Sequence, residues 1–372
     1  MWHKQPTIET ASASLPPGYV LVEVSEERHF EQVADLWSLC FGLDSYDVRN
    51  DELNFAKKHC SSLYAVIKDD RVCATTAIIM FEMLLNGTFV PCAGIASVAT
   101  DPPHRHQNLV KAMMHHSLKK VHEMKVPVAS LHPFSFPYYE RMGFAVSHLS
   151  YKIKAPVSWL RAVSSSGDCR KYRFTELNDF EPAAQVHERS LLRWNATLRR
   201  SHERWRMRLF DFGAKWRLLC HDDAYMLWNT KNKEARTLDI SEWNYVTTES
   251  YLDGLAVLGT MESQVDWVQW IDGDIAPLVS LGVSHPKPTF ELQPTMMSRV
   301  VNLDAFQEAV GKLNYDVYDP LALTAPLRAS ADAIDPGRLF QLATGFKTST
   351  TPGSIERGTQ SRFVTNYCND FF

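Results

Sequence analysis

The sequence predicts a mixed α/β protein, and three observations carry that prediction. Short β-prone runs alternate along the chain with stretches whose apolar residues have helical spacing. Two long β-prone runs, 72–85 and 88–100, are joined by Asn86-Gly87, a strong signal for a two-residue hairpin turn. Between Gly94 and Phe144 the chain reads as strand, basic loop, amphipathic helix and strand, which is the order of a parallel crossover.

The remaining elements follow from the same two periodicities. Tyr19–Val24 alternates as a strand, and Glu27–Phe41 carries an apolar stripe with helical spacing. Further strands are expected at 62–68, 126–131, 144–153, 216–220, 224–229, 235–243 and 296–301. Further helices are expected from Leu109 onward, around 138–142, and at 179–200, 201–210, 249–260, 303–313 and 336–345.

The basic loop His104–Asn108 is the first candidate site. It precedes a helix whose apolar residues fall on one face, and a helix N-terminus offers unpaired N–H groups and a partial positive charge. Arg105 and His106 add side-chain donors close to that end, so the pattern suggests a site for a phosphate-bearing cofactor. An ordinary crossover whose loop is basic is the alternative, and spacing alone leaves both open.

Composition excludes several classes of protein. The 372 residues suffice for two or three domains, and a formal net charge of −4 argues against a nucleic-acid-coating protein. Seven scattered cysteines without a C-x-x-C pair indicate reduced thiols in the cytoplasm, and we expect no membrane segment because no apolar run is long enough. The histidine pairs at 104/106 and 115/116 lack a completing carboxylate or thiol, so we expect no metal.

The motif at this crossover resembles a known family. The loop Pro103-His104-Arg105-His106-Gln107-Asn108-Leu109 and the turn Tyr139–Phe144 (YERMGF) are similar to the acetyl-CoA segment of the GNAT superfamily of N-acetyltransferases, and more narrowly to the Eis (enhanced intracellular survival) group. The runs Arg299–Ala309, Asp335–Phe346 and Asn366–Phe372 resemble, in order, landmarks of that group's C-terminal region.

The resemblance implies an α/β (α+β) fold of three parts. It implies a GNAT domain that binds acyl-CoA at 1–156, a second GNAT-like domain without the loop at 157–288, and a sterol-carrier-protein-like domain at 289–372. It further implies acetyl-CoA or another acyl-CoA as co-substrate, a small-molecule amine as acceptor, and a homo-oligomer, a hexamer in this group.

The resemblance also assigns roles to residues. Tyr139 would be the acid that protonates the departing thiolate, since a phenol with a pKa near ~10 keeps its proton at neutral pH. The α-carboxylate of Phe372 would act as the base, through water or by attraction. The main chain of Val98, Ala99 and Thr100 would contact pantetheine and the oxyanion. The phosphate-loop contacts would come from Arg105, His106, Gln107, Asn108, Leu109 and Val110.

This chain departs from the family pattern in the loop. Asn108 stands where the family has a glycine, Val110 where Gly or Ala is common, and Gln107 where a basic residue is common. Asparagine tolerates the left-handed conformation better than most residues, so the turn can survive. The sequence therefore predicts an acyl-CoA-dependent N-acyltransferase. It leaves open a non-catalytic module that binds a hydrophobic ligand or a partner, and a biosynthetic enzyme with a non-acetyl donor.

Overall fold

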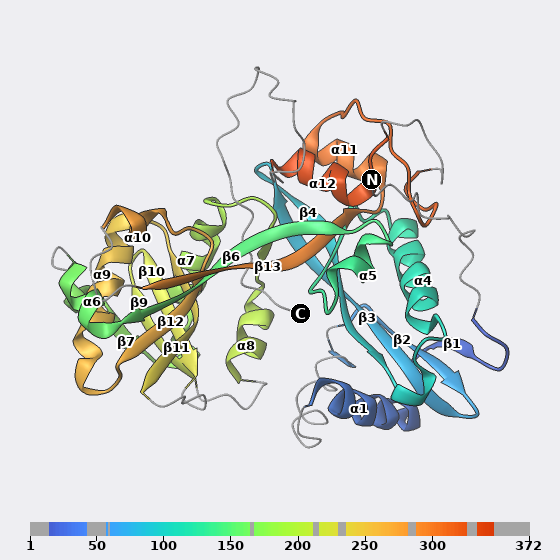
Figure 1. Ribbon diagram of the computed structural model, residues 1–372, viewed down its shortest axis with the longest axis horizontal. Helices are drawn as coiled ribbons and strands as arrows, with labels where there is room; N and C mark the ends of the chain where they lie inside the picture. Colours follow the sequence, from blue (N-terminus) through green and yellow to red (C-terminus); the bar gives the residue numbers. More distant parts are fainter. Residues whose placement is uncertain are drawn as a thin grey trace, which may run out of the picture.

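A computed structural model of the chain describes residues 15–42, 57–58, 60–163, 167–210, 216–229, 236–281, 288–325 and 333–345. In this described part, two lobes share one continuous sheet of thirteen strands (Figure 1). The strand order is β1-β2-β3-β4-β5-β13-β6-β12-β11-β10-β9-β7, and β8 pairs with β3 beside this path. The predicted mixed α/β class is confirmed.

The N-terminal lobe follows the sequence-based expectation closely. Its elements are β1 (Val20–Glu23), α1 (Glu27–Phe41), β2 (Ser62–Lys68), β3 (Arg71–Leu85), β4 (Thr88–Thr100), α4 (Leu109–Glu123), β5 (Val128–Leu131), α5 (Phe136–Glu140) and β6 (Ala145–Pro156). The predicted hairpin is present: Asn86 and Gly87 both have positive φ, of 49° and 89°, as a type I′ turn requires.

Helices α1 and α4 cover opposite faces of this half of the sheet. Successive side chains of a strand point to opposite faces, and those of β3 divide accordingly. Ala77 and Ile79 pack in the apolar cluster of α1, whereas Ile78 packs in the cluster of α4. The main core of the lobe is therefore split into an α1 side and an α4 side.

The chain from Val157 to Ser280 contains most of the remaining strands, one of which, Thr197–Arg199, pairs with β3 of the N-terminal lobe. Its elements are α6 (Val157–Val163), β7 (Arg173–Thr175), α7 (Glu181–Leu191), β8 (Thr197–Arg199), α8 (His202–Phe210), β9 (Trp216–His221), β10 (Ala224–Asn229), β11 (Thr237–Tyr245), α9 (Thr248–Gly259), β12 (Trp267–Asp272) and α10 (Ala276–Ser280). The helix predicted over 179–200 is wrong in its second half, where the chain turns and forms β8. The Asn195 side chain ties this turn to the β3–β4 hairpin, since its oxygen accepts from Asn86 N at 2.9 Å.

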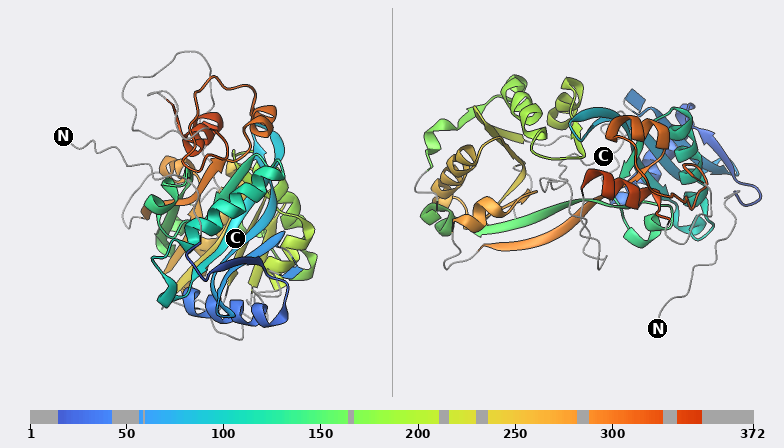
Figure 2. Two further views of the ribbon diagram at one scale, coloured as in Figure 1. Left: turned by 90° about the vertical axis from the view of Figure 1, so that its right-hand side faces the viewer. Right: turned by 90° about the horizontal axis from the view of Figure 1, so that it is seen from above.

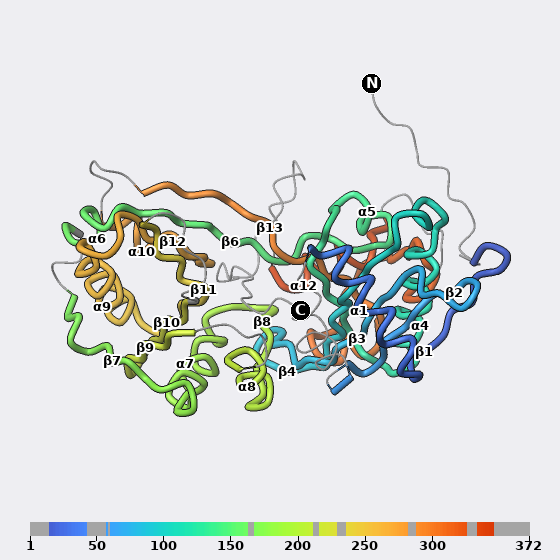
Figure 3. The backbone as a smooth tube through the Cα atoms, turned by 90° about the horizontal axis from the view of Figure 1, so that it is seen from below, coloured from blue at the N-terminus to red at the C-terminus, as the bar shows by residue number. Residues whose placement is uncertain are grey.

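Strands β6 and β13 (Thr289–Val300) pass through both lobes (Figures 2 and 3). They pair with each other, while β13 also pairs with β5 and β6 also pairs with β12. The predicted domain boundaries fall at the end of β6 and directly before β13. Because β6 and β13 continue the pairing from one lobe into the other, the two lobes are halves of one sheet.

The described part of the C-terminal region packs on the N-terminal lobe. Helices α11 (Leu303–Val310) and α12 (Pro336–Thr344) place Phe306, Leu339 and Phe340 in the apolar cluster of α1. Gly337 lets α12 approach β6, because a Cβ there would lie 2.4 Å from Ala145 N. Among the described helices, none is long and apolar enough to cross a membrane.

Candidate functional site

The predicted phosphate loop connects β4 to α4. A single 3-10 turn at Pro102–His104 precedes it, and Tyr19 holds the His104 ring with a hydrogen bond of 2.7 Å between the hydroxyl and Nδ1. His106 and Asn108 both adopt the left-handed conformation, with φ of 62° and 60°. Asn108 thus adopts the left-handed backbone conformation that was expected at this position, where the family has a glycine.

The N-terminus of α4 leaves main-chain donors free of helical partners. The first helical hydrogen bond runs from Ala112 N to Asn108 O, so the N–H groups of Leu109, Val110 and Lys111 precede the helical series. The Asn108 side chain makes no capping hydrogen bond to them. Free donors at a helix start can bind a phosphate, and this is the feature that fits the pyrophosphate of an acyl-CoA.

The side chains of the loop divide into exposed and buried groups. Arg105, His106 and Asn108 are exposed, and Gln107 is half-buried. Arg105 Nε donates to Thr100 O at 3.3 Å, which ties the loop to the end of β4. Val110, the bulky departure from the family pattern, packs against the apolar clusters beneath α4. Its bulk is thus accommodated by the core.

The three predicted main-chain positions at the end of β4 are not all paired with β3. Ala99 and Thr100 lie in the ladder with β3, opposite Thr75 and Ala74, whereas Val98 has no register partner there. On the other side, the pairing of β4 with β5 ends at Ile95 and Leu131. Beyond that pair the strands share no ladder, so the main chain of Val98 has no register partner in β5 either.

Tyr139 lies in α5, on the α4 side of the sheet. Its side chain is only 1% exposed and packs in the same apolar cluster that Val98 contacts. Ring contacts with Phe134 and Phe144 have centroid distances of 5.2 and 6.1 Å. Burial, helped by Tyr138, raises the pKa of Tyr139 above its usual value, so the phenol keeps its proton at neutral pH.

The neighbouring Tyr138 is the residue with which Tyr139 is most easily confused. It is half-buried, and the Arg141 guanidinium lies 5.7 Å from its ring centroid. Gly143 closes the turn after both tyrosines with a φ of 76°, which favours glycine. The predicted helical turn and its glycine stop are both present, although the helix spans Phe136–Glu140 and the prediction placed it at 138–142.

The other half of the predicted catalytic pair, Phe372, lies outside the described residues, as does the tail from residue 346 onward. Its role as a base stays a prediction. Within the described ranges, no group of three His, Cys, Asp or Glu side chains could hold a metal ion.

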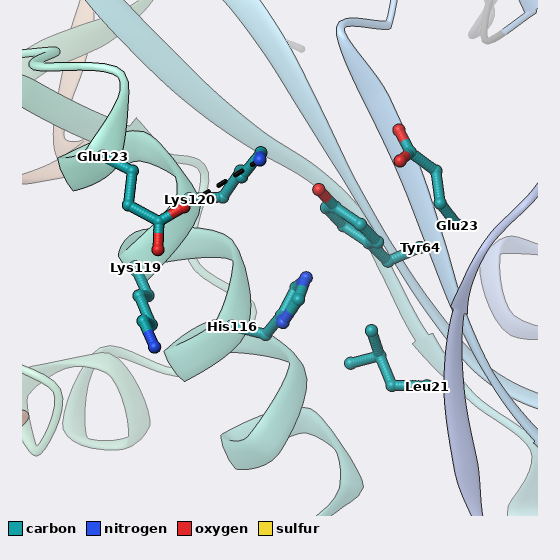
Figure 4. A pocket seen from close by; sticks show the side chains of 7 residues that line it. All are labelled: Leu21, Glu23, Tyr64, His116, Lys119, Lys120 and Glu123. Atoms are coloured by element: carbon teal, nitrogen blue, oxygen red, sulfur yellow. Dashed lines mark ion pairs between the residues drawn. The ribbon is translucent and has the colours of Figure 1, made fainter.

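A separate pocket of about 380 Å³ lies beside the later turns of α4 (Figure 4). His116, Lys119, Lys120 and Glu123 line it from α4, Tyr64 from β2, and Leu21 and Glu23 from β1. The Tyr64 and His116 rings meet edge to face at 4.7 Å, and burial followed by the charge of Lys120 lowers the pKa of His116. None of the predicted site residues lines this pocket.

Sequence reasoning missed one feature of the site, an irregularity in β4 at Ser97, which has a φ of 50°. The run from Gly94 to Ala99 is small or apolar throughout, so its pattern of side chains carries no sign of an extra residue.

Comparison with known proteins agrees with this geometry. Residues 22–147 match a model described as an acetyltransferase (GNAT) domain, and residues 196–300 match a second model with the same description. No curated protein matches the chain in sequence.

Solved structures share the fold at low identity. A probable N-acyltransferase of unknown function from Enterococcus faecalis V583 is 18% identical, with a TM-score of 0.72 over 89% of this chain and 90% of that one. A GCN5-related N-acetyltransferase from Anabaena variabilis is 17% identical, with a TM-score of 0.72 over 95% and 100%. Eis1 from Mycobacterium abscessus is 15% identical, with a TM-score of 0.73 over 95% and 100%. Residues 22–147 and 196–300 are therefore two acetyltransferase (GNAT) domains, and the chain is an acetyltransferase.

Proposed function

We propose that the chain is an N-acyltransferase that moves an acetyl group from acetyl-CoA to a primary amine of a small molecule, by direct transfer in a ternary complex. The observation that carries the proposal is the end of β4. There the main chain parts from β5, and the next segment leads through two left-handed residues into the free N–H groups of α4.

The co-substrate supplies an activated acyl group, and the chain supplies positioning, a proton donor and hydrogen bonds. The N–H groups of Leu109, Val110 and Lys111 would bind pyrophosphate oxygens, with Arg105 and His106 adding side-chain donors from the exposed loop. Val98, Ala99 and Thr100 would lie along pantetheine. Tyr139, which burial keeps protonated, would donate its proton to the departing thiolate.

Several finer features of the proposal come from the resemblance to the Eis group. The Phe372 carboxylate would receive the amine proton through water, and residues 289–372 would include a sterol-carrier-like domain. The same resemblance implies a hexamer. The scattered cysteines indicate the cytoplasm, and the net charge and the short apolar runs argue against a nucleic-acid or membrane partner.

The test is acetyl-CoA turnover against a panel of polyamines and aminoglycosides, measured as released CoA thiol. Tyr139→Phe keeps the ring and loses the hydroxyl, and we expect kcat to fall by about 10²–10⁴-fold, the usual contribution of a general acid. Tyr138→Phe is the matched control and should retain wild-type kcat. One glycine added after Phe372 would displace the terminal carboxylate and should also lower kcat. Unchanged rates in both Tyr139→Phe and the extended chain would refute the catalytic assignment.

One observation favours an alternative, a non-catalytic module that binds a hydrophobic ligand. Tyr139 is only 1% exposed, whereas an acid must reach the sulfur that it protonates. Calorimetry with CoA separates the two functions, because the module would give no heat with CoA. A biosynthetic enzyme that uses an acyl-CoA other than acetyl-CoA would bind CoA but turn over acetyl-CoA poorly.

A further inference from the structure

Strand β4 carries one extra residue beside the proposed acyl site. The ladder with β3 pairs Thr75 with Ala99 and Ala77 with Ala96, so Ser97 and Val98 together lie opposite the single residue Thr76. This arrangement is a β-bulge, and the left-handed φ of 50° at Ser97 is unusual for a residue other than glycine.

The faces of β4 confirm the extra residue. Ile95 and Val98 both contact the apolar cluster that contains Tyr139, although they are three positions apart. Ala96 and Ala99 both belong to the cluster of α1. In a regular strand, residues three apart lie on opposite faces. The bulge thus turns the Val98 side chain to the side of Tyr139.

Two buried side chains hold this bulge from the α1 side. Trp37 Nε1 donates to Thr75 Oγ1 at 2.9 Å, and Thr75 Oγ1 donates to Ser97 O at 2.9 Å. Trp37 is 2% exposed and Thr75 is fully buried. An indole N–H can only donate and a carbonyl can only accept, so the threonine hydrogen can point only toward Ser97.

This contact determines where the next N–H points. The carbonyl of Ser97 and the N–H of Val98 belong to one peptide group, and a trans peptide directs them in opposite directions. Because Thr75 holds the carbonyl, the Val98 N–H points away from Thr75. At this position β4 no longer pairs with β5, since their ladder ends at Ile95.

We propose that Trp37 and Thr75 are positioning residues that lock the Ser97–Val98 peptide, so that the Val98 N–H donates to the acyl oxygen as negative charge develops there. This inference rests on the proposed function. Without the Thr75 hydroxyl, Ser97 O loses its buried partner and the peptide is free to rotate. A rotated peptide would present a carbonyl, which repels the oxyanion, in place of the donor.

The test replaces the hydroxyl without changing side-chain shape. Loss of one oxyanion donor costs about 10²–10³-fold in kcat, and we expect Thr75→Val to lower kcat by at least about 10-fold because the peptide rotates in only part of the molecules. The KM for acetyl-CoA should stay near the wild-type value, since the interaction develops in the transition state. Thr75→Ser keeps the donor and should recover most of kcat. Trp37→Phe removes the indole donor together with part of a buried ring, and its kcat should fall between those of Thr75→Ser and Thr75→Val.

Thr197→Val is the matched control. Thr197 is a buried strand residue of β8 whose hydroxyl has no hydrogen-bond partner in the described part of the chain, so its loss should leave kcat unchanged. The proposed lock is refuted if Thr75→Val and Thr197→Val have the same kcat. It is also refuted if the lower kcat of Thr75→Val is accompanied by a lower thermal stability that Thr75→Ser does not restore.

A wild-type chain without any acyl-CoA turnover would instead refute the proposed function. The lock is then judged from a crystal structure of Thr75→Val. A Ser97 carbonyl rotated away from β3 supports the lock, and an unrotated carbonyl overturns it.

Discussion

Arg299 of β13 and Asp319 form an ion pair of 2.6 Å, Nη2 to Oδ2, between two side chains without solvent exposure. The Arg299 guanidinium also donates to Met142 O in the turn after α5, and to Thr324 Oγ1 at 3.2 Å. The carboxylate accepts from the N–H groups of Leu321, Leu323 and Thr324. Burial alone would raise the pKa of Asp319, but Arg299 and these N–H groups lower it.

Arg299→Met should therefore destabilise the protein strongly. The change leaves the Asp319 charge buried without its partner, which typically costs about 3–5 kcal/mol in the free energy of unfolding. Denaturant unfolding measures the loss. Arg161→Met is the control: Arg161 pairs with Glu262 at the surface, with 62% and 53% of the side chains exposed, and such a pair contributes about 1 kcal/mol or less. Equal losses in both variants would contradict this account of Arg299.

Asn108 should be replaceable by glycine and by little else. With φ at 60°, a residue carrying Cβ is strained by roughly 1–2 kcal/mol, less for asparagine than for others. We expect Asn108→Gly to keep or raise stability and CoA affinity, and Asn108→Ala to lose about 1 kcal/mol. Thermal unfolding and calorimetry with CoA measure both. A more stable Asn108→Ala protein would show that the loop is not left-handed in solution.

His148 should make the protein less stable in mild acid. The side chain is buried, with Nδ1 at 2.8 Å from Ser147 Oγ and Nε2 at 2.8 Å from Ala196 O. Burial lowers the pKa of His148 to about 4, although the hydrogen bond to Ala196 opposes the shift. The unfolded chain binds this proton near pH 6.5 and the folded chain near pH 4, so stability falls as pH drops through that window, by up to about 3 kcal/mol.

His148→Gln removes this titration, so its stability relative to that of the wild type should increase by up to about 3 kcal/mol as pH falls from 6.5 to 4. His202→Gln, at an exposed histidine, should leave the pH dependence of unfolding as in the wild type. A His148→Gln protein that loses as much stability in acid as the wild type would place the acid sensitivity elsewhere.

Asp272 should have the opposite effect, over an overlapping range of pH. Burial raises the pKa of this carboxyl to about 7, although the N–H of Asp274 and the hydroxyl of Tyr245, which donate to it, favour the charged form. The folded chain keeps the proton up to about pH 7 while the unfolded chain loses it near pH 4, so stability falls as pH rises between these values, by up to about 4 kcal/mol.

The check is the pH dependence of unfolding in Asp272→Asn. The variant should lack this loss of stability with rising pH, and at pH 8 it should unfold at a higher temperature than the wild type. Asp222→Asn is a suitable control, because that side chain is 88% exposed. If both variants follow the wild-type curve, Asp272 is ionised at a normal pH in the folded chain.

Local signals in the sequence were sufficient for the N-terminal lobe. The apolar stripe of Glu27–Phe41 and the Asn86-Gly87 turn predict α1 and the β3–β4 hairpin to within one residue of their observed bounds. The loop, Asn108 and the position of Tyr139 were also predictable, since each is a short motif whose conformation depends on nearby residues.

Features that depend on distant residues were not predictable. Strand β8 has only three residues and exists because Leu198 pairs with Met83, so its own sequence favours helix as readily. Strand β12 is held between β6 and β11, and the bulge at Ser97 is held by Trp37, sixty positions earlier. Contacts between residues this far apart in the sequence leave no sign in the local periodicity of apolar residues.

The place of β5 between β4 and β13 has a consequence for synthesis on the ribosome. Leu131 pairs with Ile95 on one side and with Met297 on the other. At about 5–20 residues per second, Met297 is made roughly 10 to 30 seconds after Leu131, and for that time the nascent lobe has an unpaired sheet edge. Until β13 is made and pairs with β5, that edge can pair with other chains. Correct folding in this interval therefore depends on a low concentration of nascent chains or on chaperones.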